Sequence, residues 1–150
     1  MYSTSNQYLH MSVLENTSFC FESNTSEEEF TFDDIVTAVI HVESRGDNNA
    51  YNESEKAAGC LQIRPIMVRE VNRNLKLMNK SIRYTLDDRW SREKSIEMFT
   101  IMSNQIPYKE CLTSIEFAEQ VARRWNGGTR GFKKKSTLSY WEKVKEQILD

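Results

Sequence analysis

Residues 31–46 read TFDDIVTAVIHVESRG and carry the signals of a complete helix together with both of its ends. Thr31 is a favourable N-cap residue, and the two aspartates that follow suit the positive end of the helix dipole. Four aliphatic side chains fall on one face at helical spacing: Ile35, Val36, Val39 and Ile40. We therefore expect a helix that runs to about Glu43 and ends with Gly46 in the left-handed cap.

Further helical segments follow this one, so the chain is expected to be mainly α, of α+β type. Helix starts are indicated at Pro65, at Ser91 and at the capping box Thr113–Glu116, and a last helix follows the basic loop Lys133–Lys135. The expected core faces are Ile66, Val71, Leu75 and Met78, then Ile96, Phe99, Met102 and Ile106, then Ile115, Ala118, Ala122 and Trp125, and finally Leu138, Trp141, Val144 and Ile148. Only residues 57–63 suggest a short strand or a buried turn. The prediction is one helical domain with a small β/turn segment there.

Charge divides the chain unevenly. Residues 1–44 hold eight acidic groups and no basic one, whereas residues 45–150 hold 20 basic and 14 acidic groups, for a net charge of +6. Residues 1–29 are polar and acidic, which is typical of a flexible N-terminal arm, and residues 30–150 form the expected domain. A mildly basic domain suits an anionic partner such as a cell-wall polymer, or simply has a solvated charged surface.

Several function classes find little support in the sequence. No apolar run approaches the roughly 20 residues of a membrane span, and the first residues do not resemble a secretory signal peptide. The three cysteines (Cys20, Cys60 and Cys111) form no CxxC pair and are expected to be buried or free thiols. With only two histidines in the chain we expect no metal site, and we expect no cofactor because phosphate-binding glycine loops are absent. The single basic run is more typical of a solvated loop than of a nucleic-acid site.

Glu43 has a position that favours acid chemistry. It follows the apolar stripe at the C-terminal end of the first helix, where the negative end of the dipole and a partly apolar cleft would both raise the pKa of a carboxyl group. A raised pKa is what a general acid needs near neutral pH. An ordinary solvated glutamate at a helix end is the alternative interpretation.

Four short motifs resemble those of lytic transglycosylases of the soluble type, in the lysozyme-like superfamily. They are, in order, Glu43-Ser44, Gly59-Cys60-Leu61-Gln62, Trp125-Asn126-Gly127-Gly128, and Thr137 with Tyr140 and Val144. The resemblance covers roughly residues 30–148. The chain departs from the family pattern at two positions, since Trp125 stands where a tyrosine is common and Lys56 stands where a glycine is common.

The resemblance implies cleavage of the β-1,4 bond between N-acetylmuramic acid and N-acetylglucosamine in peptidoglycan. Glu43 would be the single catalytic acid and base, and the product would be a 1,6-anhydro-muropeptide. Ser44 and Gln62 would hold the sugar or Glu43 by hydrogen bonds, Asn126 would hold a sugar amide or a loop carbonyl, and Tyr140 would lie close to Glu43. Each of these four side chains could instead serve only the fold.

Other functions stay open at this point. A hydrolysing lysozyme of the same fold would need a second carboxylate, for which Asp47 and Glu55 are the candidates. A non-catalytic protein that binds the cell wall or builds a virion, and a nucleic-acid module, are further alternatives. For the favoured interpretation the partner is the peptidoglycan glycan strand and the protein acts as a monomer. Because no signal peptide is recognised, we expect delivery by a holin, a virion or a secretion machine, as for a phage endolysin.

Overall fold

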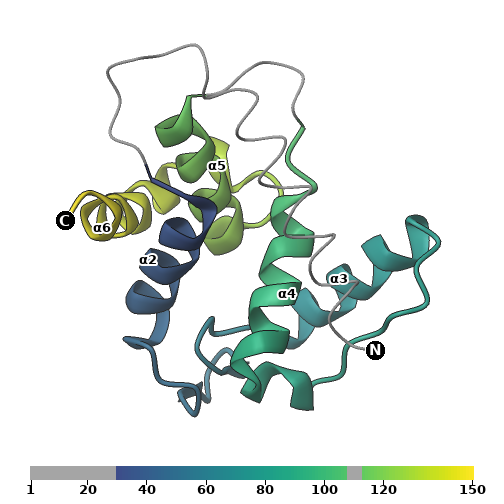
Figure 1. Ribbon diagram of the computed structural model, residues 1–150. Coiled ribbons are helices and arrows are strands. Elements are labelled where there is room, and N and C mark those ends of the chain that lie inside the picture. The colour runs from purple at the N-terminus through teal and green to yellow at the C-terminus, as the bar shows by residue number, and fades with distance from the viewer. Residues whose placement is uncertain (1–29, 108–112) are drawn as a thin grey trace.

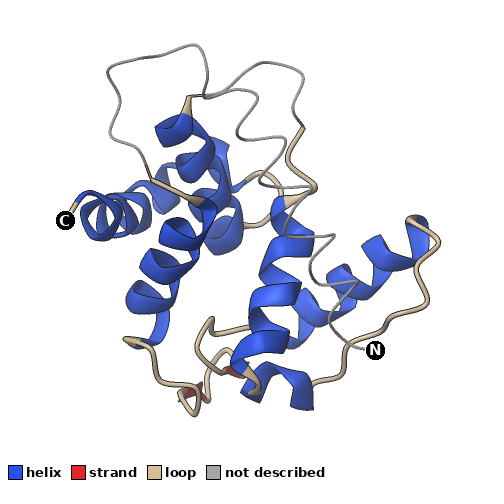
Figure 2. Cartoon of the chain, viewed as in Figure 1, coloured by secondary structure: helices blue, strands red, loops and turns tan. Residues whose placement is uncertain are grey.

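A computed structural model describes residues 30–107 and 113–150, in which five α-helices and one two-stranded antiparallel sheet are found (Figures 1 and 2). The α-helices are α2 (Phe32–Ser44), α3 (Pro65–Leu77), α4 (Arg92–Ser103), α5 (Ser114–Gly127) and α6 (Leu138–Leu149). The strands are β1 (Tyr51–Asn52) and β2 (Ala57–Ala58), and the short 3₁₀ helices are η1 (Asp87–Trp90), η2 (Gly131–Lys133) and η3 (Lys135–Thr137). The predicted fold class, mainly α with a small β segment near 57–63, is confirmed.

Two of the sequence predictions fall outside the described residues. The expected arm, residues 1–29, is one of them, and the state of Cys20 and Cys111 is the other. Cys60 is a buried free thiol, as predicted. None of the helices within residues 30–107 and 113–150 is long and apolar enough to cross a membrane.

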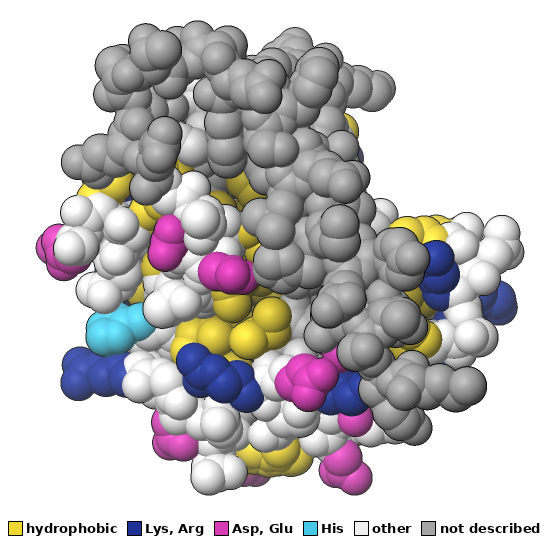
Figure 3. Space-filling model, viewed as in Figure 1, with side chains coloured by type: hydrophobic (Ala, Val, Ile, Leu, Met, Phe, Trp, Pro, Cys, Tyr) yellow, Lys and Arg dark blue, Asp and Glu magenta, His cyan; other side chains and the backbone are white. Residues whose placement is uncertain are grey.

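The helices pack around one hydrophobic core. α6 packs against both α2 and α5, while α4 packs against α3 and α5. The ring of Phe99 on α4 lies 6.0 Å from that of Phe32 on α2 and 4.8 Å from that of Trp125 on α5. The space between the ribbons of α2 and α4 in Figure 1 is filled by hydrophobic side chains in Figure 3. Burial of these apolar groups holds together helices that come from distant parts of the chain.

The predicted helix starts agree with the structure. Thr31 forms a reciprocal capping box with Asp34 at the start of α2, and Thr113 forms one with Glu116 at the start of α5. The predicted end of α2 needs a correction, because Arg45, and not Gly46, is the first residue in the left-handed region, with φ of 55°. The chain thus turns immediately after Ser44.

Some predicted core positions are wrong. Ile66, Met78 and Leu138 are 53%, 37% and 44% exposed, whereas Val68, which was not predicted, is buried. Ile66 and Leu138 lie in the first turns of their helices, and Met78 lies just after the end of α3. Four other predicted core residues are only partly buried: Ile96, Met102, Ile115 and Ile148.

One buried arginine holds the hairpin between α2 and α3 in place. The hairpin is formed by β1 and β2, with the turn that leads from β2 to Ile63. Tyr51 pairs with Ala58, and Ala58 also bridges to Ile63. The guanidinium of Arg89, only 7% exposed, donates from Nη1 to the carbonyls of Lys56 (2.7 Å) and Ile63 (3.1 Å). A buried arginine that satisfies backbone carbonyls is costly to remove, because the carbonyls would lose their partners. The sequence pattern predicted neither β1 nor this role of Arg89.

Left-handed backbone recurs in the hairpin and the turn that follows it, at Lys56, Gly59 and Gln62. Gly59 has φ of 81°, and a Cβ placed there would overlap the carbonyl oxygen of Arg89. The glycine of the Gly59–Gln62 motif is therefore needed both for its backbone conformation and for close packing. Lys56, where the resembling family commonly has glycine, has φ of 53° with an exposed side chain, so the loop follows a glycine-like path with lysine in place.

Comparing two glycine substitutions tests the close packing at the hairpin. Gly46→Ala is expected to cost about 1–2 kcal/mol of stability, because Gly46 has φ of 87° but no atom lies within 4 Å of the added methyl group. Gly59→Ala is expected to cost roughly 1–3 kcal/mol more, because the methyl group also displaces Arg89. Urea denaturation of both variants measures the difference. Equal losses at the two positions would contradict the packing argument.

Candidate active site

Glu43 lines a pocket that is built from four parts of the chain. The pocket has a volume of about 180 Å³ and lies where the end of α2, the hairpin, the start of α3 and the end of α5 meet. Three of the predicted site residues line it: Glu43, Gln62 and Asn126. The structure thus brings together side chains that lie 19 and 64 positions apart in the sequence.

Burial dominates the electrostatics of Glu43. Desolvation raises the pKa of its carboxyl group from 4.5 to about 7. The hydrogen bond from Tyr140 opposes the rise, the negative charge of Glu55 adds to it, and the positive charge of Arg64 opposes it. A carboxyl group with this pKa is protonated in a large fraction of molecules near neutral pH, and it can both give and take a proton there.

Tyr140 holds the carboxyl group in place. Its phenol donates a hydrogen bond of 2.7 Å to Oε1 of Glu43, across 97 positions of sequence. Burial and the neighbouring Glu43 raise the pKa of the phenol well above 10, so it remains a donor at all moderate pH values. The expected proximity of Tyr140 to Glu43 is confirmed. Direct contact of Tyr140 with a substrate stays a prediction.

Ser44 is placed to hold the backbone. Its hydroxyl donates to the carbonyl of Cys60 at 2.8 Å and accepts from the amide of Gly46 at 3.2 Å. Ser44 is not among the residues that line the pocket. The structure shows it joining the end of α2 to the hairpin, and the predicted hydrogen bond from Ser44 to a sugar or to Glu43 stays a prediction.

Gln62 combines a structural role with a free acceptor. Its Nε2 donates to the carbonyls of Ala50 (3.1 Å) and Gly59 (2.9 Å), which fixes the orientation of the amide. Within the part of the chain that the structure describes, no group donates to its Oε1, and the side chain lines the pocket. Its backbone has φ of 48°, an uncommon value for a residue with a side chain. Such backbone strain is tolerated where the surroundings fix the residue.

Asn126 and Trp125 bring the end of α5 to the pocket. Asn126 is exposed, and no described group is seen to bond its amide, so both ends of the amide are open to a ligand. Trp125 is mostly buried against Phe99 yet still borders the pocket. Trp125 thus forms an aromatic wall of the pocket.

Three polar residues of the pocket were not predicted as site residues of the favoured function. Asn52, Glu55 and Arg64 all line it. The sequence suggests Glu55 only as a second carboxylate for a hydrolase. Arg64 directly precedes Pro65, the first residue of α3, and that position could have indicated a side chain projecting from a helix start. Nothing in the sequence pattern distinguishes Asn52 from its polar neighbours.

Comparison of the sequence with protein-family models and with curated proteins finds no match. In residues 30–107 and 113–150, no group of three or more His, Cys, Asp or Glu side chains is arranged to hold a metal ion. The case for a function therefore depends on the geometry around Glu43.

The raised pKa of Glu43 has a measurable cost in stability. Between pH 4.5 and pH 7 the carboxyl group of Glu43 holds a proton in the folded protein that it releases in the unfolded chain. The free energy of unfolding of the wild type therefore falls by about 3 kcal/mol as the pH rises across this window. Glu43→Gln cannot ionise and still accepts a hydrogen bond from Tyr140. The variant is expected to be close to the wild type in stability at pH 4.5 and more stable by up to about 3 kcal/mol at pH 8.

Urea denaturation at the two pH values measures this effect, and Glu53→Gln is the matched control because Glu53 is an exposed carboxylate of the same loop region. The gap between Glu53→Gln and the wild type gives the background against which the change for Glu43→Gln is measured. A gap between Glu43→Gln and the wild type that changes with pH no more than this background would contradict the buried, protonated carboxyl group.

Proposed function

We propose that this protein is a lytic transglycosylase that cleaves the β-1,4 bond between N-acetylmuramic acid and N-acetylglucosamine in peptidoglycan. The observation that carries the proposal is the Glu43 carboxyl group, with a pKa of about 7, held by Tyr140 in a pocket with polar walls. The four motifs that resemble the transglycosylase family add support, because each of them contributes a residue to this pocket or to the hydrogen bond at its carboxyl group.

Glu43 would act twice in the reaction. It first donates its proton to the glycosidic oxygen as the bond from C1 of the muramic acid to that oxygen breaks. The carboxylate then takes the proton from the C6 hydroxyl of the same sugar, while O6 forms a bond to C1. The product is the 1,6-anhydro sugar, and Glu43 ends protonated, as it began. No water enters the reaction, so no second carboxylate is required.

The other polar groups suit an N-acetylated sugar. The free Oε1 of Gln62 can accept a hydrogen bond from a sugar hydroxyl or an acetamido N–H, and the Asn126 amide can both donate and accept. Tyr140 would orient Glu43 through its hydrogen bond to Oε1. On this proposal the partner is the glycan strand outside the cytoplasm, and delivery by a holin, a virion or a secretion machine would bring the protein to it.

A hydrolysing lysozyme is the second candidate, and the position of Glu55 favours it. Glu55 lines the same pocket and its charge acts on Glu43, so it could activate a water molecule. Asp47, the other candidate, does not line the pocket and accepts a hydrogen bond from the amide of Asn49 at 2.8 Å. The exposure of Glu55 is the reason to rank hydrolysis second, because a water-activating base is better shielded from solvent.

The products of a peptidoglycan digest separate the candidates. Wild type is expected to release anhydro-muropeptides, and Glu43→Gln to lose at least about 10³-fold in rate, because the only general acid is gone. Glu55→Gln is expected to retain activity within about threefold. Mass spectrometry of the digest measures all three proteins, since a hydrolase product is about 18 Da heavier by one water.

Reducing-end products together with a large loss in Glu55→Gln would establish the hydrolase instead. Binding of glycan strands by the wild type without any cleavage would indicate a non-catalytic wall-binding protein.

The pH dependence of the reaction rate should follow the protonation of the Glu43 carboxyl group. Since the acid must be protonated, kcat/KM is expected to fall as the pH rises through about 7. Tyr140→Phe removes a hydrogen bond that stabilises the carboxylate, so the pKa of Glu43 and the falling limb of the profile should both move to higher pH. Tyr51→Phe, which alters an exposed tyrosine that does not line the pocket, should keep the wild-type profile. A limb that does not move in Tyr140→Phe would contradict the assignment of the limb to Glu43.

A further inference from the structure

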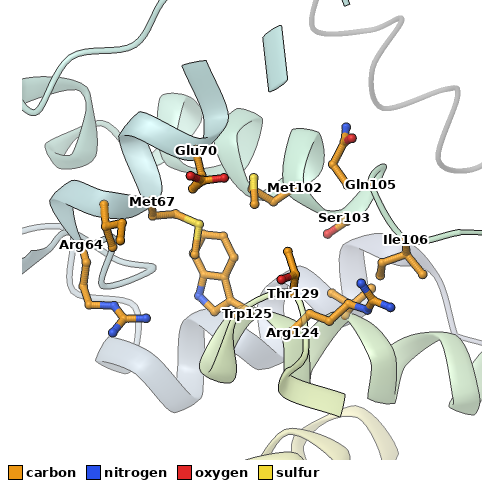
Figure 4. A pocket seen from close by; sticks show the side chains of 13 residues that line it. Arg64, Met67, Glu70, Met102, Ser103, Gln105, Ile106, Arg124, Trp125 and Thr129 are labelled. Atoms are coloured by element: carbon orange, nitrogen blue, oxygen red, sulfur yellow. The ribbon is translucent and has the colours of Figure 1, made fainter. Parts of the chain in front are cut away.

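The pocket at Glu43 continues into a second pocket between α3, α4 and α5, which has a volume of about 240 Å³ (Figure 4). Arg64, Met67 and Trp125 line both, so the two pockets form one binding region. A separate surface lies outside both linings, where the hairpin meets η1.

Strand β1 presents its two side chains to opposite faces of the hairpin, as successive residues of a strand do. Asn52 lines the pocket at Glu43, whereas Tyr51 lies outside both pocket linings and is 47% exposed. Beside Tyr51 lies Trp90 of η1, which is 40% exposed. The centres of the two rings are 6.0 Å apart and the ring planes meet at 39°. We call this pair of exposed rings the Tyr–Trp platform.

The two rings of the Tyr–Trp platform are carried by elements that are fixed to each other. Arg89, the neighbour of Trp90 in η1, is buried. Its guanidinium donates to the carbonyls of Lys56 and Ile63, which belong to the hairpin and the turn after it. Its own carbonyl oxygen lies so close to Gly59 that a Cβ there would overlap it. Rings that are held in this way lose little freedom when a ligand binds, which favours affinity.

The surroundings of the Tyr–Trp platform are acidic. Residues 46–56 and 86–93, which carry the two rings, hold six carboxylates and three basic side chains, for a net charge of −3. In Figure 3 a small hydrophobic patch reaches the surface at the lower edge, where the hairpin and η1 lie in Figure 1, with acidic side chains on either side of it. An acidic neighbourhood disfavours phosphate groups and the anionic surface of a membrane. It leaves a neutral ligand as the partner that fits.

We propose that the Tyr–Trp platform binds a glycan strand at a point outside the catalytic pocket, by stacking of its rings on the apolar faces of N-acetylated sugars. The N-acetylglucosamine units of such a strand are neutral, with C–H groups on their faces and hydroxyl and amide groups on their edges. They therefore match exposed rings that carry a phenol O–H and an indole N–H at their polar ends. This inference rests on the proposed function, and it adds a non-catalytic anchor that holds the enzyme on the insoluble wall.

Binding to purified peptidoglycan sacculi tests the anchor, with Glu43→Gln in every protein so that the strands stay intact. Tyr51→Ala combined with Trp90→Ala is expected to raise the Kd roughly tenfold, the effect of losing two ring contacts. Tyr51→Phe combined with Trp90→Phe keeps two rings and should stay within about threefold of the parent, which assigns the loss in the alanine pair to the rings. Leu77→Ala is the matched control, because it removes an exposed apolar side chain from the end of α3, and it should leave the Kd unchanged.

Nuclear magnetic resonance of the indole N–H groups reports where a soluble probe binds. The chain has three tryptophans, and the signal of Trp90 is the one that is missing in Trp90→Phe. Addition of a β-1,4-linked N-acetylglucosamine oligomer to Glu43→Gln is expected to shift the Trp90 signal, together with that of Trp125 at the pocket. A shift of the Trp125 signal alone would overturn the anchor while the proposed function stands.

Other results would also overturn the anchor. One is a Kd for sacculi that is the same in the alanine pair and in the parent. Another is tighter binding to vesicles of anionic phospholipid than to sacculi, which would make the rings a membrane contact. A third is self-association in sedimentation that the alanine pair abolishes, which would make them a contact between two copies of the chain. The proposed function fails separately, if the wild type cleaves no glycan, and a shift of the Trp90 signal by the oligomer would then still support a sugar-binding surface.

Discussion

The hydrogen bond from Tyr140 to Glu43 is the interaction on which the rest of the site depends. It connects α6 to the end of α2, which are the two helices that pack together across the longest separation in sequence. A buried carboxyl group without a partner would be costly, and the phenol supplies that partner while the burial keeps the pKa near 7. The same contact therefore helps to hold the helices together and limits the rise in the pKa of Glu43 that burial causes.

The hairpin that completes the pocket is held by hydrogen bonds to its backbone as well as by the packing of buried side chains. Arg89 and Ser44 both bind carbonyls of this segment, and Gly59 allows Arg89 to approach. Of the four non-glycine residues with positive φ in residues 30–107 and 113–150, three lie between α2 and α3, and Gln62 is one of them. Strain in that segment is balanced by these hydrogen bonds, which leaves Gln62 in a fixed orientation at the pocket.

Local signals predicted the helices well, because caps and apolar periodicity depend on neighbouring residues: Thr31, Pro65, Ser91 and Thr113 all mark true helix starts. The convergence of Glu43, Gln62 and Asn126 on one pocket was anticipated only through the resemblance. Arg89 could not have been predicted, since its partners are carbonyls 26 and 33 positions away that have no signature in the sequence. The lining of the pocket between α3, α4 and α5 likewise depends on how these three helices meet.

The separation of Glu43 from Tyr140 also has a consequence for the cell that makes the protein. During synthesis, α2 and the hairpin leave the ribosome before the residues of α6 have been joined to the chain. Until residue 140 is present and α6 has packed against α2, Glu43 lacks its phenol partner and the shielding that raises its pKa. A partly made or truncated chain thus carries a solvated, ionised glutamate in place of an acid. Under the proposed function, the capacity to cut the cell wall arises only with the folded domain and not with any fragment of it.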